Sequence, residues 1–309
     1  MDLQKLRYFT EVVERSSLGK AAEALGVSQP AITKSLRLLE AELDVKLLHR
    51  TSTGVRPTEY GQSLYTHARI VLAEVRHARD AIDELKGREI RYVRIGSLPS
   101  LSELVARACA LTIANTPTLQ LRVLEMQNYQ LLPALRRGDV DFAVGLTDAT
   151  EPESGIRSRL LGHDRLRFTV RKGHKIARAA RPELKHLVGY PWVFPIVGTA
   201  HFTISIQRMF EEAGLPAPQA SIETGSMQFV KSFVRHTDAV AILSEHVTEA
   251  ERDAGLLVSL PIESPALTRP IGLFDLASAP RPRVLRELTS NLERVFRDWE
   301  NAHPVTPPR

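Results

Sequence analysis

The 309-residue sequence has one cysteine, Cys109, and no run of about 18 apolar residues. A single cysteine excludes an intrachain disulfide and a cysteine zinc cluster, and the missing apolar run excludes a conventional transmembrane helix. The first residues, MDLQKLRYF, do not combine a cationic start with a long apolar stretch, as a secretory signal would. We therefore expect a cytoplasmic protein with no membrane partner. Cys109 is expected to be a small buried residue, with a redox sensor as the alternative.

Phosphate-binding and catalytic motifs are also missing. The sequence contains no Gly-x-Gly-x-x-Gly, Gly-x-x-x-x-Gly-Lys, His-Glu-x-x-His or Gly-x-Ser-x-Gly pattern, and its ten histidines are scattered. An enzyme with a site assembled from distant residues is the main alternative class. An enzyme would, however, have no use for the patterns of the N-terminal segment and of the long helix that follows it. We predict that the protein is not an enzyme and uses no cofactor or metal ion.

The composition is that of a soluble globular protein, with 43% hydrophobic and 25% charged residues, and its length suggests two or three domains. The formal net charge is +5, yet residues 1–90 contain 14 Lys and Arg against 13 Asp and Glu. The excess of positive charge is therefore not concentrated in the N-terminal part. Any nucleic-acid affinity there has to come from local placement and from two or more copies acting together.

The segment from Ser17 to Leu43 predicts two short amphipathic helices joined by Gly26-Val27-Ser28. Small apolar residues recur at helical spacing in the first helix, and Ser28 caps a second helix that has Pro30 in its first turn. This combination is typical of a helix-turn-helix, whose second helix enters the major groove. The residues predicted to contact DNA on this helix and its cap are Ser28, Gln29, Pro30, Thr33, Lys34 and Arg37. The alternative is an ordinary helical hairpin with a solvated charged face.

A further helix precedes the hairpin and a strand pair follows it. The apolar stripe of residues 3–13 completes a three-helix unit, and residues 46–50 and 54–58 predict two short strands around a polar turn. Residues 1–58 therefore predict a winged helix-turn-helix. Arg50 and Arg56, at the base of the wing, are expected to lie along the phosphate backbone.

Residues 59–87 predict one long helix. Its apolar residues alternate at spacings of four and three, which is typical of a coiled-coil seam, and the opposite face is polar. The residues predicted to form this dimerisation seam are Leu64, Ala68, Val71, Val75, Ala78, Ile82 and Leu85. At about 43 Å, such a helix is long enough to hold two heads one turn of DNA apart. The alternative is a long helix that lies on its own domain.

From Tyr92 onward strands and helices alternate, which predicts a mostly parallel sheet with helices on both faces and two lobes. Lobe I comprises about 91–164 and 269–303, and lobe II about 165–268. The expected strands are 92–96, 119–126, 140–146, 166–173, 192–194, 219–223, 239–243 and 269–276. The expected helices are 101–115, 129–137, 201–213, 227–235 and 282–302, and residues 303–309 are expected to fray.

At this point the chain resembles the LysR-type transcriptional regulators over essentially its whole length, and within them the subgroup named for regulation of a galactose-binding protein. The matching head motif is Phe9, Ala21-Ala22, Leu25, Ser28-Gln29-Pro30-Ala31-Ile32, Leu39-Glu40, Leu43, Leu47-Leu48, Arg50, Thr58 and Gly61. Further matches are Arg137-Gly138-Asp139-Val140-Asp141, Gly189-Tyr190-Pro191-Trp192 and Ala213-Gly214-Leu215. Leu48 stands where Phe is common and Tyr60 where Ala is usual. The wing turn 51–53 lacks a frequent basic residue, which weakens any role of the wing in the minor groove.

The resemblance implies an effector domain of 91–303 with a fold like that of periplasmic binding proteins. It also implies a ligand-responsive regulator that binds double-stranded promoter DNA as a homodimer or homotetramer, acts with RNA polymerase, and often activates a divergent operon while repressing its own gene. A sugar or an organic or aromatic acid is the expected effector, and a metabolic or transport operon the expected target. The residues themselves do not decide between activation and repression. A DNA-binding protein without a ligand would not explain the two lobes.

Ligands of such α/β lobes bind beyond the carboxyl ends of strands, where helix N-termini present free amides. Three corners of this kind are rich in hydroxyl groups and glycine: 97–100, 198–202 and 224–227. The predicted effector-binding residues are Ser97, Pro99, Ser100, Gln127, Thr147, Thr199, His201, Phe202, Thr224, Ser226 and Met227. The alternative is that Ser100, Thr199 and Ser226 only cap helices. His201 is the group among these residues that titrates near neutral pH.

Overall fold

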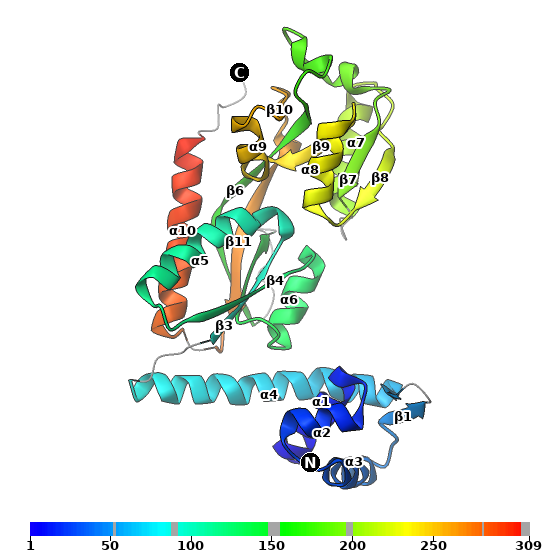
Figure 1. Ribbon diagram of the computed structural model, residues 1–309, viewed down its shortest axis with the longest axis vertical. Helices are drawn as coiled ribbons and strands as arrows, with labels where there is room; N and C mark the ends of the chain where they lie inside the picture. Colours follow the sequence, from blue (N-terminus) through cyan, green and yellow to red (C-terminus); the bar gives the residue numbers. More distant parts are fainter. Residues whose placement is uncertain (52–53, 88–91, 148–154, 196–199, 280, 304–309) are drawn as a thin grey trace. The chain divides into compact units, whose positions relative to one another are not determined.

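The computed structural model describes residues 1–309 except 52–53, 88–91, 148–154, 196–199, 280 and 304–309. The chain divides into two compact units (Figure 1). The first comprises Met1–Glu89 with Arg136–Asp139, and the second Ile90–Leu135 with Val140–Arg309. No helix in the described ranges combines the length and apolar character that crossing a membrane requires.

The first unit begins with the predicted three-helix head, built from α1 (Leu3–Arg15), α2 (Leu18–Leu25) and α3 (Gln29–Leu43). Asp2, Ser17 and Ser28 cap these helices, since each side chain accepts a hydrogen bond from a first-turn amide. Gly26 ends α2 in the left-handed conformation at φ 65°. The buried core of the head consists of Phe9, Val12, Ala21, Ala22, Ile32, Leu36, Leu39, Leu47 and Val55.

A two-stranded wing and a long helix complete this unit. β1 (Leu48–Thr51) pairs antiparallel with β2 (Gly54–Pro57), and α4 (Glu59–Leu85) follows. The backbone amide of Val55 donates to the carbonyl of Ser16 at 2.9 Å, where Ser16 joins α1 to α2. The wing is therefore tied to the corner from which the helix-turn-helix starts.

In the described part of the second unit, nine strands form one sheet in the order β4-β3-β5-β11-β6-β9-β7-β8, with β10 paired to β6. The strands are β3 (Tyr92–Ser97), β4 (Gln120–Glu125), β5 (Phe142–Leu146), β6 (Ile156–Arg171), β7 (Trp192–Pro195), β8 (Ala220–Thr224), β9 (Val240–Ser244), β10 (Leu257–Ser259) and β11 (Thr268–Leu276). The α-helices are α5 (Ser102–Asn115), α6 (Asn128–Arg136), α7 (Ala200–Glu212), α8 (Met227–His236), α9 (Glu249–Asp253) and α10 (Arg283–Ala302). Short 3-10 helices are η1 (Pro99–Leu101), η2 (Ile176–Arg178), η3 (Leu184–Leu187), η4 (Glu245–Thr248) and η5 (Pro265–Leu267).

The sheet has two parallel ends joined by an antiparallel middle. β3 pairs parallel with β4 and β5, and β7 pairs parallel with β8 and β9. β6 and β11 are antiparallel to each other, and they connect the two ends. We call the part around β3, β4 and β5 lobe I and the part around β7, β8 and β9 lobe II. A single strand pair thus serves both lobes.

The predicted mostly parallel sheet is wrong in its middle, where β6 and β11 pair antiparallel, and β10 was not predicted. One strand boundary was also wrong. The strand expected to begin at Leu166 begins at Ile156, ten residues earlier, and this extra half pairs with β11. This half of the strand is only partly buried, and it contains the polar residues Arg157, Arg159, His163 and Arg165 at alternate positions. Such a polar alternation lacks the β-branched and aromatic residues that normally indicate a strand.

Each lobe has its own apolar core. In lobe II, Trp192 meets the rings of Phe168 and Phe210 edge-on, with centroids 6.0 and 5.7 Å apart. In lobe I, α10 runs along α5 (Figure 1), and Cys109 is buried in this core as predicted. Burial raises the pKa of the Cys109 thiol to about 11. The thiolate needed for redox sensing is therefore scarce at neutral pH, which argues against that alternative.

Gly26 and Gly54 provide a test of the head's backbone. Both have positive φ, 65° and 137°, but a Cβ on Gly26 would meet open space whereas one on Gly54 would overlap with the Ser16 carbonyl oxygen. Gly26→Ala is expected to lower the free energy of unfolding by about 1–2 kcal/mol, the cost of a left-handed backbone for a residue with a Cβ. Gly54→Ala should lower it by more, because the overlap with Ser16 adds to this cost. Thermal unfolding followed by circular dichroism measures the difference.

Trp192 and Trp299, the two tryptophans of the chain, both lie in the second unit. Tryptophan fluorescence therefore reports on that unit and serves as the internal control. Equal losses for the two glycine variants in circular dichroism, or a shift of the fluorescence transition, would contradict the close contact at Ser16.

Candidate functional site

The outer face of α3 is polar and uncovered. Ser28, Gln29, Pro30, Lys34 and Arg37 are exposed and Thr33 is half-buried. The opposite face places Ile32, Leu36 and Leu39 in the head core. The helix therefore packs through one side and presents the side chains predicted to contact DNA on the other.

Lys34 and Arg37 are not neutralised by neighbours. Within the part of the chain that the structure describes, neither side chain makes a hydrogen bond or an ion pair, although several other cations of the head do. Those paired cations are Lys5 with Glu42 at 2.9 Å, Lys46 with Glu40 at 2.8 Å, and Arg15 with Glu11. The two cations on the α3 face therefore remain available for phosphate groups.

The wing presents Arg56, which is exposed on β2 opposite His49 of β1. Arg50 stands opposite Val55 in the strand pair, but its side chain lies outside the described residues, as do residues 52–53 of the wing turn.

The predicted seam on α4 has two parts. Leu64 packs against the head core, Ala68 is buried and Val75 is half-buried. Val71, Ala78, Ile82 and Leu85 are exposed, and the exposed fraction rises to 88% at Leu85. The first two turns thus lie on the head, as the alternative of a helix on its own domain supposed, while the later apolar side chains face outward.

Several of the predicted effector-binding residues make local hydrogen bonds. Ser97 is fully buried and its hydroxyl donates to the Leu98 carbonyl at 3.1 Å. The hydroxyls of Thr147 and Ser158 lie 3.3 Å apart. The Ser226 amide donates to the Thr224 hydroxyl and the Gln127 amide to the Gln130 side chain. Thr199 and the side chains of His201 and Phe202 lie outside the described residues.

A cavity of about 410 Å³ lies between the two lobes. Three of the predicted effector-binding residues, Pro99, Ser226 and Met227, line it. Ser226 also caps α8, since its hydroxyl accepts from the Phe229 amide at 3.2 Å. The remaining lining residues are Ser102, Glu103, Arg107, Glu125, Gly225, Gln228, Lys231, His246, Val247, Glu249 and Ala250. The two helix corners at Pro99 and Ser226 therefore do meet, whereas Ser97, Ser100, Gln127, Thr147 and Thr224 do not line this cavity.

The cavity contains charges that the sequence reasoning missed. Arg107 of α5 donates to Glu103 at 3.0 Å and, across the gap between the lobes, to Glu249 of α9 at 2.9 Å. Burial alone would lower the pKa of Arg107, but the two carboxylates outweigh it and raise the pKa. Glu125 accepts from the Ser102 hydroxyl. In the sequence these charges are indistinguishable from the solvated face of a helix, because their partners come from distant parts of the chain.

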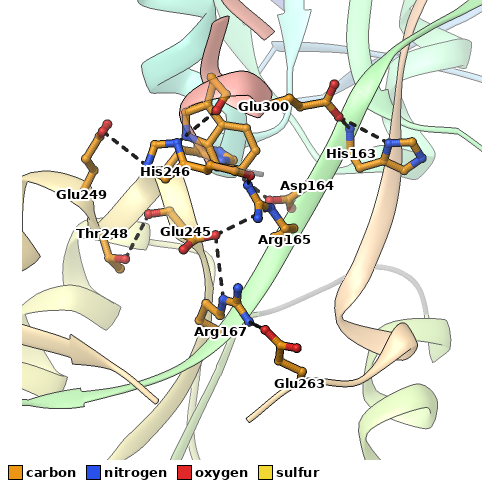
Figure 2. A network of polar contacts seen from close by, with 12 residues as sticks. His163, Asp164, Arg165, Arg167, Glu245, His246, Thr248, Glu249, Glu263 and Glu300 are labelled. Carbon is orange, nitrogen blue, oxygen red and sulfur yellow. Dashed lines mark hydrogen bonds and ion pairs between the residues drawn. The ribbon is translucent and has the colours of Figure 1, made fainter. Parts of the chain in front are cut away.

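Beside the cavity, a network of polar side chains with the buried Asp164 at its centre joins the lobes along β6, which pairs with β11 there (Figure 2). Asp164 of β6 is inaccessible to solvent and accepts from Ser244 at 2.9 Å and from Arg269. The Nδ1 atom of His246 lies 3.7 Å from the Asp164 carboxylate, and its Nε2 atom lies 2.5 Å from the Ser100 carbonyl in lobe I. His246 therefore links a predicted effector corner to the buried carboxylate.

Further contacts of the network involve α10. The Arg165 guanidinium lies over the Trp299 ring at 5.0 Å and 3.6 Å from Glu245. Glu300 accepts from the His163 amide at 2.7 Å. Burial would raise the pKa of Asp164, but Arg269 and then His246 outweigh it and lower the pKa. The carboxylate is thus charged in the folded chain at neutral pH.

Two protein-family models match the chain. The model described as "Bacterial regulatory helix-turn-helix protein, lysR family" matches residues 3–62, and that described as "LysR substrate binding domain" matches residues 86–297. Among curated proteins, the HTH-type transcriptional regulator PcaQ of Agrobacterium fabrum is 34% identical over 273 residues, which cover 87% of this chain and 86% of that protein. The HTH-type transcriptional regulator GbpR of Azospirillum brasilense is 27% identical over 91% of this chain and 82% of its own length.

Solved structures share the fold over the full chain. A full-length OxyR variant from Pseudomonas aeruginosa has a TM-score of 0.74 at 20% identity and covers 100% of this chain and 99% of its own. Full-length CbnR, determined in complex with its target DNA, has a TM-score of 0.68 at 20% identity and covers 96% of this chain and 100% of its own.

Asp164→Asn tests the buried network. Removing the anion leaves Arg269 and His246 without their buried partner, and the expected loss at neutral pH is about 3–5 kcal/mol of unfolding free energy. Because the pKa of Asp164 is lowered on folding, its contribution is present above the ordinary value of 3.8 and is lost as the pH falls below it. The loss in the variant should therefore be smaller at pH 3 than at pH 7, measured by urea unfolding with tryptophan fluorescence.

Asp253→Asn is the matched control, because Asp253 is an exposed carboxylate of the same unit. It should leave stability nearly unchanged at both pH values. A loss in Asp164→Asn that is equal at pH 3 and pH 7 would argue against a charged Asp164 as the stabilising group.

Proposed function

Because this chain belongs to the LysR family of bacterial transcriptional regulators, we propose that it binds promoter DNA through two copies of its head and alters transcription when a small molecule occupies the cavity between its lobes. It is a regulator of transcription and not an enzyme. Its proposed target is a metabolic or transport operon, and its proposed location is the cytoplasm, where promoter DNA is accessible.

The α3 face carries the DNA-binding part of this proposal. Lys34 and Arg37 are exposed cations that make no hydrogen bond or ion pair with the described residues, and Gln29 lies on the same helix at its N-terminal end. Side chains in this position of a helix-turn-helix reach base edges and phosphates in the major groove. The proposed DNA contacts are Ser28, Gln29, Pro30, Thr33, Lys34, Arg37, Arg50 and Arg56. The relative CbnR, which shares the fold, is named as a complex with its target DNA.

The exposed apolar side chains of α4 support a homodimer. Val71, Ile82 and Leu85 are 41%, 50% and 88% exposed on a helix whose other face is polar, and pairing two such helices would cover them. We infer that the later part of the seam, Val71, Val75, Ala78, Ile82 and Leu85, forms this interface, whereas Leu64 and Ala68 pack within the chain itself. A homotetramer would be a pair of such dimers. RNA polymerase is the proposed partner on the promoter.

The cavity supports a small-molecule effector. Its volume of about 410 Å³ lies within the range of pockets for small ligands, roughly 300–1,000 Å³. Hydroxyl, carboxylate and cationic groups on its wall suit a sugar or an organic acid. Pro99, Ser226 and Met227, which line the cavity, are proposed as contacts. Thr199, His201 and Phe202 stay predictions, because Thr199 and the side chains of His201 and Phe202 lie outside the described residues.

Footprinting of the promoter beside the chain's own gene, with and without a panel of sugars and organic acids, tests the proposed function. The expected result is a protected region with two half-sites, whose pattern changes with at least one compound. A protein that protects no promoter DNA would overturn the proposal.

Arg37→Ala is expected to weaken operator binding and to lower the salt dependence. Each lost phosphate contact reduces the slope of log K against log salt by about 1, so a dimer that loses two copies of Arg37 should show a reduction of about 2. Binding titrations between 50 and 200 mM salt, about the range where such contacts matter, measure the slope. Arg178→Ala removes the same charge from an exposed site in the second unit and should leave the slope unchanged. An unchanged slope in Arg37→Ala would remove this residue from the interface.

Ile82→Asp is expected to convert the dimer to a monomer, because it would bury a charge in the apolar seam. Ile82 is half exposed in the single chain, so the change should not disturb the fold. Analytical ultracentrifugation measures the mass. Arg79→Asp, on the exposed polar face, is the control that should stay dimeric, and a dimeric Ile82→Asp would place the interface elsewhere.

A further inference from the structure

Three residues at the junction of head and α4, Glu40, Thr58 and Gly61, belong neither to the proposed DNA contacts nor to the seam. They belong to three different places in the chain: α3, the residue before α4, and the first turn of α4. All three meet the same short backbone segment, Lys46-Leu47-Leu48, which leads from α3 into the wing.

Glu40 binds this segment from the side of α3. Its carboxylate accepts from the Leu47 amide at 2.9 Å, from the Leu48 amide at 3.4 Å and from Lys46 Nζ at 2.8 Å. The Glu40 side chain is only 13% exposed. Burial would raise its pKa, but the hydrogen bonds from Lys46 and from the two amides lower it below its ordinary value. The charged carboxylate therefore fixes the backbone at the start of the wing through these hydrogen bonds.

Thr58 binds the same segment from the side of α4. Its hydroxyl donates to the Lys46 carbonyl at 2.7 Å and accepts from the Gly61 amide at 3.0 Å. Its backbone amide donates to the Leu47 carbonyl at 2.9 Å. One side chain thus caps α4 and at the same time ties it to the segment.

Gly61 allows α4 to approach closely enough for these bonds. A Cβ at this position would overlap with the Leu47 carbonyl oxygen and lie 3.2 Å from the Pro57 Cβ. The requirement is for space and not for a positive φ. The first turn of α4 is therefore in direct contact with the backbone that follows α3.

A second attachment holds α4 further along its length. The Tyr65 hydroxyl donates to Glu14 of α1 at 3.2 Å, and Arg69 lies 3.0 Å from the same carboxylate. Leu64 packs into the head core between these two attachments. With both attachments in place α4 has one direction relative to α3, and without the first it is held to α1 only.

We propose that Glu40, Thr58 and Gly61 are positioning residues that join α3 and α4 into one rigid body, so that the dimer measures the distance between two DNA half-sites. This inference rests on the proposed function, since it requires two heads joined through α4. If α4 pairs with its copy, the fixed angle between α3 and α4 sets how far apart the two α3 helices lie. A rigid connection gains affinity only when the half-site spacing matches, whereas a flexible one tolerates other spacings.

The test compares three DNA probes: a single half-site, the two-half-site operator obtained by selection from random duplexes, and that operator with two base pairs inserted. The insertion moves one half-site by about 7 Å and rotates it by about 70°. For the wild-type dimer the insertion should weaken binding about tenfold or more, because bivalency is lost.

Thr58→Val is the decisive variant, because it keeps the shape of threonine but loses the hydroxyl that bonds Lys46 and Gly61. It should bind the half-site within about twofold of wild type while the insertion penalty falls to about threefold or less, as expected for a flexible connection. Thr58→Ser keeps the hydroxyl and should restore the wild-type penalty. Gly61→Ala, which forces α4 away from Leu47, should reduce the penalty in the same way.

Two outcomes would overturn the inference. One is that Thr58→Val and Gly61→Ala bind the half-site normally but are weakened by the two-base-pair insertion as much as the wild type is. The other is loss of half-site binding in Thr58→Val, which would assign the residue to the stability of the head itself. Failure of the wild-type protein to bind any of the probes would instead count against the proposed function.

Discussion

The head depends on one close approach, that of α4 to the backbone carbonyl of Leu47. Only glycine at position 61 leaves room for it, and the approach brings Thr58 within hydrogen-bond distance of Lys46. Glu40 accepts from the amides on the other side of the same segment. The backbone between α3 and the wing is thereby satisfied although it is partly buried, which is the condition for a stable loop in such a place. The direction of the long helix follows from the position of α3.

The charge of the head follows from the same arrangement. Its acidic and basic residues almost balance in number, and many cations are held by carboxylates within the head. Among the described residues of the head, Lys34 and Arg37 are the unpaired cations on the α3 face, and Arg56 is the one on the wing. Because non-specific affinity grows with the number of neutralised phosphates, a single head of this kind binds weakly. Affinity and selectivity then have to come from two heads bound together, which makes their relative placement decisive.

Helix ends, turns and apolar helix faces in the head were predicted correctly from the sequence, because they depend on residues that are close in the chain. The Gly26 turn, the Ser17 and Ser28 caps and the apolar faces of α1 to α3 depend on neighbours a few residues away, and the structure has them as expected except for Leu3 and Leu43, which are exposed. The first half of β6 and the charged wall of the cavity depend on partners far away in the chain. Arg107 meets Glu249 only because the fold brings α5 to α9. No local pattern distinguishes such a residue from one on a solvated helix face, so it was missed.

The contacts between the lobes differ in strength, and that difference decides where the lobes can separate. The ion pair of Arg107 and Glu249 is partly exposed, and pairs of this kind contribute about 0–1 kcal/mol. The Asp164 cluster is buried, and breaking it by removing one partner costs about 3–5 kcal/mol. β6 pairs with β11 in lobe I and with β9 in lobe II, and Asp164 lies on it close to where these two stretches meet. The buried cluster is therefore the stronger connection between the lobes, and the contacts at the cavity are the weaker one. A ligand with a differential affinity of a few kcal/mol, enough to shift a two-state balance strongly, needs to act only on the weaker contacts.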